Sequence, residues 1–228
     1  MSNWPSGTPP TTRTVSSTGC WARWPARFAT ISQNDAIDTH TDGSAEEAPT
    51  NEPFPLPWPP LSRGSIALRP WGATPKDGEF LAAAWAEADI ARFCAVPADA
   101  DRDAAAAWIA AEPERRDAGL ALDLAIFELG SPEVILGEVG VTMAEPTKRW
   151  CELGFWLFPG VRGEGRATHA VDAFTDWLLN VQNVKRVFAR IHPDNPRSGA
   201  VVERSGFQRA GELPDGTIVW VADQPPPL

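Results

Sequence analysis

Apolar positions recur at two different spacings in the second half of the chain. Residues 151–157 form a short apolar and aromatic run bounded by Pro and Gly, which is typical of a buried strand. After the glycines that follow, apolar side chains recur three and four positions apart, which predicts a helix. The helical positions are Ala167, Ala170, Val171, Phe174, Trp177, Leu178 and Val181. The pattern predicts a strand, a glycine-rich turn and a helix in succession.

Further elements are predicted on both sides of this unit. The expected strands cover residues 66–69, 120–129, 134–141, 185–191, 207–212 and 217–222. The expected helices cover 75–85, with Thr74 as N-cap and Pro75 at the first position, and 101–111. A short helix should begin at Asn195 and Pro196 and end at Gly206. The strand–helix–strand unit around the glycines should form a right-handed crossover with parallel pairing.

The predicted turn between that strand and that helix is rich in glycine and arginine. It reads Arg162-Gly163-Glu164-Gly165-Arg166-Ala167-Thr168. The N–H groups of the first helical turn have no partner within the helix, so this end favours a phosphate. Glycine allows close backbone approach, and arginine can pair with phosphate oxygens. The run is neither a Walker loop nor a complete dinucleotide fingerprint, and a plain helix entry is the alternative interpretation.

Four blocks of sequence resemble the GNAT superfamily of N-acetyltransferases, and in particular its RimJ/RimL-like branch. The glycine turn matches the pattern Arg/Gln-x-x-Gly-x-Gly/Ala, and residues 191–207 are similar to an Asn-x-x-Ser…Glu-Lys-x-Gly-Phe block. Leu68-Arg69-Pro70-Trp71 resembles the opening strand of the branch, and residues 152–157 resemble its Glu-x-Gly-Tyr-Trp-Leu strand. The blocks occur in the family's order over residues 64–222. The resemblance implies an α/β (α+β) fold, with a mixed, mostly antiparallel sheet of about seven strands and about four flanking helices.

The resemblance also implies acetyl-CoA as acyl donor and assigns residues to it. The backbone of Leu157 would lie against the pantetheine arm, and Asn195 would lie near the pantetheine or thiol end. The loop amides would bind the pyrophosphate. The residues expected in this cradle are Val161, Arg162, Gly163, Glu164, Gly165, Arg166, Ala167 and Thr168.

Acetyl transfer to an amine needs a group that accepts a proton. Glu152 matches a family carboxylate, and burial among aromatic neighbours would raise its pKa; a structural ion pair with an arginine is the alternative. Glu138 and Asp123 are the second and third candidates. The chain contains no tyrosine, and the position where many family members have one is Val202 here. By resemblance Ser198 replaces it, as a hydrogen-bond donor to the thiolate or carbonyl.

Two further residue types have open interpretations. Trp71, Trp156 and Trp220 could line a groove for a cationic acceptor, or they could pack in the core. His169 stands where the branch usually has Glu, and its position in the helical period predicts a solvated side chain.

The expected activity is acetyl transfer to a primary amine by direct attack in a ternary complex. The acceptor would be a protein N-terminal amine, a basic peptide N-terminus or a small amine such as a polyamine or aminoglycoside. A non-catalytic acyl-CoA sensor or scaffold is the alternative. Pocket shape decides among acceptors, and a monomer and a homodimer are both compatible with the sequence.

The composition argues against several other classes of protein. The 228 residues carry a net charge of −10, which argues against nucleic acid and is compatible with a basic substrate. No run of 18 apolar residues and no apolar leader is present, so we expect a cytoplasmic protein without a membrane span. Three widely spaced cysteines and three scattered histidines predict free thiols and no metal site.

Three segments are expected along the chain. Residues 1–62 are rich in Pro, Ser and Thr and are expected to form a disordered extension that ends in a stiff proline segment at 53–60. Within the extension, Trp21, Trp24 and Phe28 have near-helical spacing, and a short helix there could dock on the domain or on an acidic partner. Residues 63–224 would form the acetyltransferase domain and 225–228 a short tail.

Overall fold

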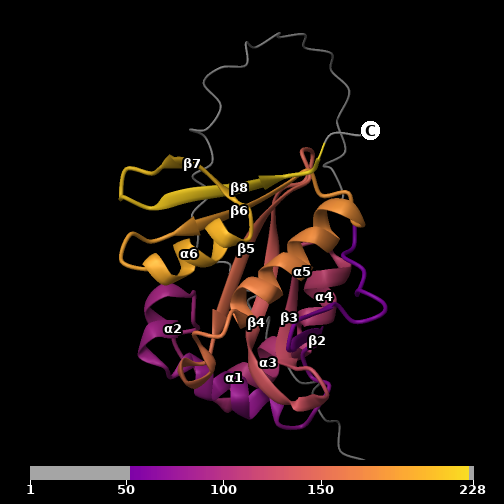
Figure 1. Ribbon diagram of the computed structural model, residues 1–228. Coiled ribbons are helices and arrows are strands. Elements are labelled where there is room, and N and C mark those ends of the chain that lie inside the picture. Colours follow the sequence, from indigo (N-terminus) through magenta and orange to yellow (C-terminus); the bar gives the residue numbers. More distant parts are fainter. Residues whose placement is uncertain (1–51, 226–228) are drawn as a thin grey trace, which may run out of the picture.

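A computed structural model describes residues 52–225 of the chain, and the docking segment expected at residues 21–28 lies outside them. One sheet of eight strands has the order β1-β2-β3-β4-β5-β6-β8-β7 (Figure 1). Its strands are β1 (Ser62–Arg63), β2 (Ile66–Pro70), β3 (Ala121–Glu128), β4 (Ser131–Glu145), β5 (Trp150–Leu157), β6 (Arg186–Ile191), β7 (Gln208–Glu212) and β8 (Ile218–Asp223).

Six α-helices and one short 3₁₀ helix flank the sheet within the described residues. They are α1 (Asp77–Trp85), α2 (Ala88–Phe93), α3 (Arg102–Ala110), α4 (Glu112–Asp117), the 3₁₀ helix η1 (Pro159–Val161), α5 (Arg166–Asn180) and α6 (Pro196–Arg204). Neighbouring strands are antiparallel except β5 and β6, which are parallel and connected through α5. The expected fold class and the parallel crossover are therefore confirmed, with one more strand than expected.

Three local predictions were wrong in detail. Helices α2 and α4 have six residues each, too few to show a helical period in the sequence. Helix α1 begins at Asp77 instead of 75, and no side chain caps it. The Thr74 hydroxyl instead hydrogen-bonds the Asp77 carboxylate. The helix therefore starts two residues later than expected, after Lys76 as N-cap.

The helices cover the two faces of the sheet unequally. Helix α5 packs on β1, β2, β4, β5 and β6, and α1 and α4 pack on β4 and β3 from the other face (Figure 1). Alternation along β5 sends Cys151, Leu153 and Leu157 into the cluster with α5, and Trp156 into the cluster with α1 and α3. Each face of the sheet therefore has its own apolar core.

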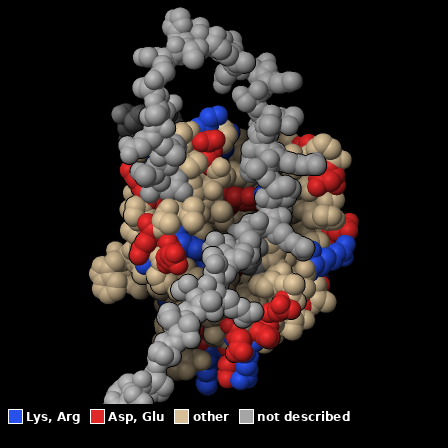
Figure 2. Space-filling view, turned by 180° about the vertical axis from the view of Figure 1, so that it is seen from behind, with Lys and Arg blue, Asp and Glu red and all other residues tan. Residues whose placement is uncertain are grey.

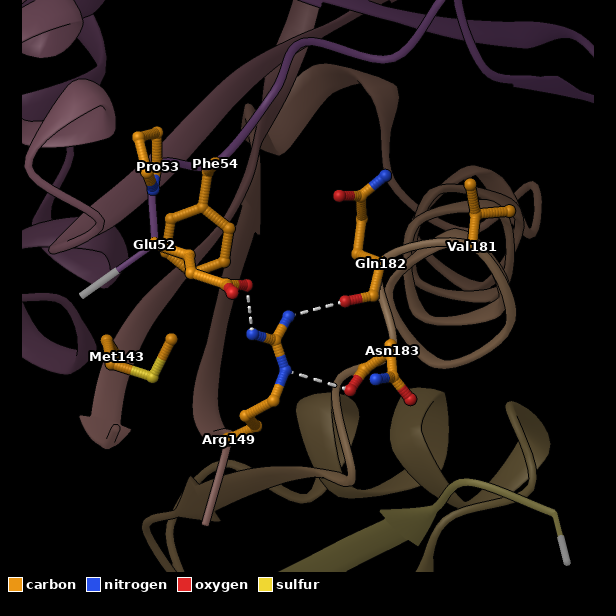
Figure 3. A pocket seen from close by; sticks show the side chains of 8 residues that line it. All are labelled: Glu52, Pro53, Phe54, Met143, Arg149, Val181, Gln182 and Asn183. Atoms are coloured by element: carbon orange, nitrogen blue, oxygen red, sulfur yellow. Dashed lines mark hydrogen bonds and ion pairs between the residues drawn. The ribbon is translucent and has the colours of Figure 1, made fainter. Parts of the chain in front are cut away.

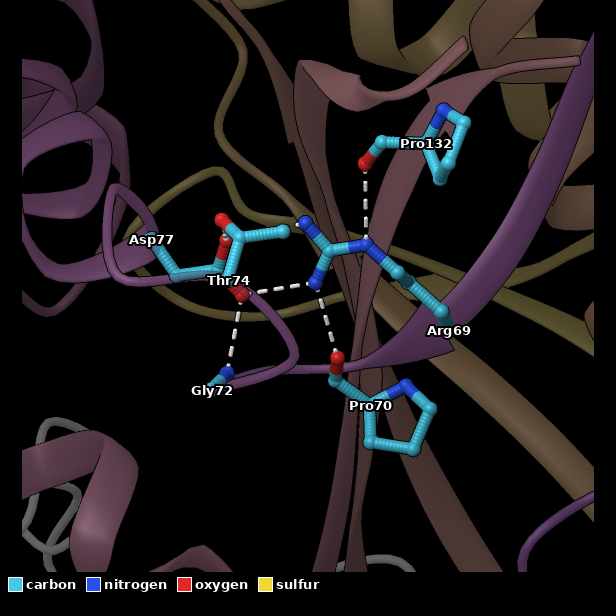
Figure 4. A network of polar contacts seen from close by, with 6 residues as sticks. All are labelled: Arg69, Pro70, Gly72, Thr74, Asp77 and Pro132. Carbon is cyan, nitrogen blue, oxygen red and sulfur yellow. Dashed lines mark hydrogen bonds and ion pairs between the residues drawn. The ribbon is translucent and has the colours of Figure 1, made fainter. Parts of the chain in front are cut away.

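A buried ion pair fixes α1 to the sheet (Figure 4). Arg69 on β2 donates to both oxygens of Asp77, at 2.6 and 2.9 Å, and also to the carbonyl oxygen of Pro132. The backbone N–H of Gly72 donates to the same carboxylate at 2.8 Å. Burial alone would raise the pKa of Asp77, but the hydrogen bonds from Arg69 and Thr74 outweigh it and lower that pKa. The Arg69–Asp77 ion pair therefore positions α1 beside the strands that carry the site described below.

The proline segment before β1 belongs to the folded unit. Phe54 is only 4% exposed and packs in the α5-side core. Its backbone N–H donates to the Arg116 carbonyl at 3.0 Å. Arg149 binds Glu52 at 2.5 Å and also donates to the carbonyls of Gln182 and Asn183, beside a pocket of about 300 Å³ (Figure 3). An aromatic residue among the prolines, before the expected domain start at residue 63, therefore fills a core position.

Charged side chains are mixed in sign where they are visible on the rear face. Figure 2 shows red and blue side chains next to one another there. Within residues 52–225, no helix is both long enough and apolar enough to cross a membrane.

Candidate active site

The central feature of the site is a divergence of two parallel strands. β5 and β6 pair through Trp150↔Arg186 to Glu152↔Phe188, and the pairing then stops. β5 nevertheless continues to Leu157 and β6 to Ile191. The sheet therefore opens between these two carboxyl ends. Chain order places α5 after β5 and α6 after β6, so the N-termini of both helices follow strands that border the opening.

The glycines of the turn are required by backbone conformation. Gly163 has φ +94° and Gly165, the N-cap of α5, has φ +76°; both values are in the region that favours glycine. A Cβ at Gly163 would meet no atom within 4 Å, so space is not the constraint. No side chain caps α5, which leaves its first-turn N–H groups available to an anion.

The two arginines of the turn bind carbonyl and carboxylate groups of the protein itself. Arg162 donates through Nε to the Leu157 carbonyl at 2.9 Å and pairs with Asp89 of α2 at 2.8 Å. Arg166 donates to the Val161 carbonyl at 3.1 Å and pairs with Glu164 at 2.9 Å. In this structure both guanidinium groups therefore fix the conformation of the loop. The hydrogen bond from Arg162 also connects the loop to Leu157, which was expected to lie along the cofactor.

The second helix at the opening begins as the sequence predicts. The Asn195 side chain accepts a hydrogen bond from the Ser198 backbone N–H at 3.2 Å, and Pro196 occupies the first turn. One turn further along α6, Val202 is fully buried in the α5-side core. The position where the family resemblance implies a tyrosine therefore fills a core site here and carries no group that can donate a proton.

Glu152 lies at the vertex of the opening, in the last pair that β5 forms with β6. Both of its oxygens accept hydrogen bonds from Arg190 of β6, at 2.7 and 2.6 Å. The two side chains are 19% and 12% exposed. This is the ion pair that the sequence offered as the alternative to a catalytic base. No sequence signal identified Arg190, which is one of two arginines in β6.

Glu138 lies one strand away and is buried. Trp156, its cross-strand neighbour on β5, donates from Nε1 to Oε1 at 3.2 Å, and Oε2 has no hydrogen bond to any described residue. Burial, followed by the charge of Asp123, raises the pKa of Glu138 to about 8. The indoles of Trp156 and Trp71 and the charge of Arg115 oppose the rise without cancelling it.

Glu138 and Glu152 share one face of the sheet. The register pairs Glu138 with Trp156 and Thr142 with Glu152, and alternation puts both carboxylates on the face away from α5. The structure therefore groups Glu152, Leu157, the glycine turn, Asn195 and Ser198 around the opening, with Glu138 set behind Trp156.

The tryptophans do not form one groove. Trp71 and Trp156 are buried in the cluster with α1 and α3. Trp220 is half-buried and lines a pocket of about 260 Å³ between α6 and β8, which Asn195, Glu203 and His192 also border. The structure therefore separates two of these rings from the third.

His169 is not a solvated side chain as the helical period predicted. Its ring packs against Gly64 in the β1–β2 turn, where an added Cβ would collide with it, and its Nδ1 is buried. The prediction failed because a turn from a distant part of the chain covers that side of α5.

The described cysteines are poor nucleophiles. Burial raises the pKa of the Cys151 thiol to about 12, and burial together with the Glu138 charge does the same for Cys94. Within residues 52–225, no cluster of three His, Cys, Asp or Glu side chains could hold a metal ion.

Comparison with known proteins identifies the family. Residues 65–208 match the acetyltransferase (GNAT) domain. Ribosomal-protein-serine acetyltransferase from Escherichia coli is 26% identical over 88 residues, which cover 39% of this chain and 49% of that protein, so the match spans about half of its length. N-acetyltransferase p20 from Bacillus licheniformis is 25% identical over 61% of this chain and 78% of that protein.

Solved structures share the fold. Ribosomal-protein-S5-alanine acetyltransferase from Vibrio fischeri has a TM-score of 0.63 at 18% identity, over 72% of this chain and 96% of that one. RimJ from Mycobacterium smegmatis, in complex with CoA-disulfide, has a TM-score of 0.60 at 20% identity, over 72% and 85% of the two chains. Since the domain match covers more than half of the sequence, the chain belongs to the acetyltransferase (GNAT) family.

Proposed function

We propose that this protein transfers the acetyl group of acetyl-CoA to a primary amine by direct attack in a ternary complex. The observation that carries the proposal is the opening between β5 and β6. The N-terminus of α5, which no side chain caps, follows the strand on one side of this opening. A GNAT relative of the same fold, MccE, has been solved in complex with acetyl-CoA and AMP. The bound thioester supplies the activated acetyl group.

The cradle for the cofactor is formed mostly by backbone. The amides of residues 163–168, at the positive end of α5, would bind the pyrophosphate. Arg162 and Arg166 would act by fixing the loop, since each is bound to a loop or strand carbonyl. Leu157 and Val161 would border the pantetheine arm. Asn195, whose Oδ1 caps α6, would direct its NH₂ group toward the arm.

We assign Glu138 as the group that accepts the proton of the amine, directly or through water. Its unpartnered Oε2 and its raised pKa suit a carboxyl that must gain and lose a proton near neutral pH. Both oxygens of Glu152 are engaged by Arg190, so Glu152 would hold the vertex of the opening and not accept the proton. Ser198, next to the α6 N-cap, would donate a hydrogen bond to the thiolate or carbonyl.

The acceptor is proposed to be a protein N-terminal amine. Two relatives are named for acetylating ribosomal proteins, at serine and at the alanine of uS5. A net charge of −10 is compatible with a basic peptide that arrives as an ammonium ion. Polyamine and aminoglycoside acceptors use the same chemistry and differ in shape, so they belong in the same test.

The test is thiol release from acetyl-CoA in the presence of a panel of amines. The panel contains peptides with free N-terminal serine or alanine, their N-terminally blocked forms, a polyamine and an aminoglycoside. The proposal expects release with at least one unblocked amine and none with the blocked peptides. Calorimetric binding of CoA without turnover of any amine would instead identify an acyl-CoA sensor or scaffold.

A further inference from the structure

A second buried carboxylate lies beside Glu138. Asp123 is on β3 and Glu138 on β4, and the register pairs Ala125 with Glu138 and Asp123 with Gly140. Alternation places both carboxylates on the same face of adjacent strands, two residue pairs apart. Their residues are 1% and 5% exposed.

The absence of a side chain at Gly140 makes room for the Asp123 carboxylate. A Cβ built on Gly140 would collide with Asp123 Oδ1. Arg115 of α4 binds the other oxygen, Oδ2, at 3.4 Å and is itself held by the Trp108 carbonyl and by the Trp108 ring. The Asp123 carboxylate is therefore fixed between a strand glycine and one guanidinium group.

The two carboxyl groups interact with each other and with the same guanidinium group. The charge of Asp123 raises the pKa of Glu138, and the charge of Arg115, which pairs with Asp123, lowers it. Two buried carboxylates at close range cannot both ionise without a large free-energy cost, so one keeps its proton. Arg115 stabilises the ionised form of Asp123, which leaves the proton to Glu138.

From this arrangement we infer that Asp123 is a positioning residue for the reaction, whose negative charge sets the proton affinity of Glu138, the group that accepts the amine proton. The inference rests on the proposed function, in which Glu138 accepts the amine proton. The other groups that face Glu138 are the Trp156 indole from β5, the Trp71 indole from the β2–α1 loop and the Cys94 thiol after α2, and that thiol keeps its proton.

The proton balance of the reaction agrees with this role. An ammonium ion and a thioester become an amide, a thiol and one free proton. Ionised Glu138 takes the first proton from the ammonium ion, which frees the nitrogen lone pair to form the N–C bond. As the C–S bond breaks, the thiolate takes the second proton that the nitrogen loses. Glu138 then returns its proton to water. A neighbouring negative charge sets the pH at which that last step becomes favourable.

The experiment compares two full-length variants that should act in opposite directions. Asp123→Asn removes a negative neighbour, so the acid limb of the kcat/KM profile should move to lower pH. Arg115→Gln removes a positive neighbour, so the same limb should move to higher pH. We expect each change to alter the proton affinity by about tenfold or more. Two shifts of opposite sign cannot come from a general loss of packing.

A titration of the carboxyl carbons by NMR gives a readout that does not depend on turnover. The Glu138 signal is identified by its loss in Glu138→Gln, and Asp123→Asn should lower its titration midpoint. An unmoved midpoint in Asp123→Asn would overturn the inference, as would shifts of equal sign in the two variants. If Glu138→Gln turns over normally, the proposed proton acceptor is wrong, while the titration still measures the coupling to Asp123.

Discussion

Glu152 and Arg190 form a bidentate ion pair, with distances of 2.7 and 2.6 Å, at the point where β5 and β6 separate. Glu152 belongs to the last residue pair of the two strands, and Arg190 extends from the next residues of β6. The pair therefore connects the two edges of the opening where the backbone hydrogen bonds end. A bidentate guanidinium–carboxylate contact fixes orientation as well as distance.

The first prediction follows from the Glu152–Arg190 ion pair. Glu152→Gln should destabilise the fold by roughly 1–3 kcal/mol, because a half-buried guanidinium loses its charged partner. Turnover should fall less than in Glu138→Gln. Chemical denaturation and steady-state kinetics of Glu152→Gln, Arg190→Gln and the double variant measure both effects. Additive losses in the double variant would show that the ion pair contributes no coupling.

The second prediction concerns the cradle. Gly165→Asp should weaken CoA binding at least about tenfold, because it places a negative charge at the N-cap of α5 next to the expected pyrophosphate. The matched control is Gly165→Asn, which has the same shape, no charge and better tolerance of a positive φ. Calorimetry with CoA should show a much smaller loss for Asn than for Asp. Equal affinities of the two variants would place the pyrophosphate elsewhere.

The third prediction concerns Glu138. Since its pKa is raised to about 8, the ionised form that accepts a proton grows as pH rises through that value, and kcat/KM should rise with it. Glu138→Gln should lower turnover about 10²-fold or more and remove this limb of the profile, while CoA binding stays unchanged.

The pH dependence of stability provides the control for Glu138→Gln. In the folded protein Glu138 keeps its proton up to a pH of about 8, whereas in the unfolded chain it loses the proton near its ordinary pKa of 4.5. The ionisable carboxyl therefore lowers the free energy of unfolding as pH rises from 4.5 toward about 8. Glu138→Gln should therefore unfold at a higher temperature than wild type at pH 8, and the gain should shrink at pH 5. A lower midpoint at both pH values would show that the carboxyl is needed for packing.

The fourth prediction concerns the proline segment. Phe54→Ala should destabilise the domain by about 3 kcal/mol or more, because a buried aromatic ring leaves a cavity in the α5-side core. Trp58→Ala, in the same segment, should change stability by less than about 0.5 kcal/mol, since Trp58 is 90% exposed. A chain that begins at Leu61 should lose stability as Phe54→Ala does. Equal midpoints for that truncation and the intact chain would contradict the placement of Phe54.

The sequence predicts the fold more completely than the site. Alternation in β5 and the helical period of α5 are local signals, and both elements were found with ends correct to one residue. Asn195 was correctly identified as the N-cap of α6 because capping is also local. Helices of six residues carry too little periodicity to be recognised.

The predictions that failed depend on long-range contacts. Arg190 lies 38 positions from Glu152, and Gly64 meets His169 across more than a hundred residues, so neither pairing leaves a pattern in local sequence. Phe54 looked like one more residue in a proline-rich extension because its burial depends on Arg116 and on the α5-side core. The proposed choice of Glu138 over Glu152 as proton acceptor likewise depends on Arg190 and Asp123, which only the folded chain brings near them.

The central claim is direct transfer of acetyl from acetyl-CoA to an amine, and a labelling experiment tests it most directly. The protein is mixed with acetyl-CoA labelled in the acetyl group, first alone and then with the acceptor found in the amine panel. With both described thiols buried and protonated, the account predicts no label on the denatured protein in either sample, and label on the amine in the second. Thiol release without an amine, together with label retained on the protein, would contradict it.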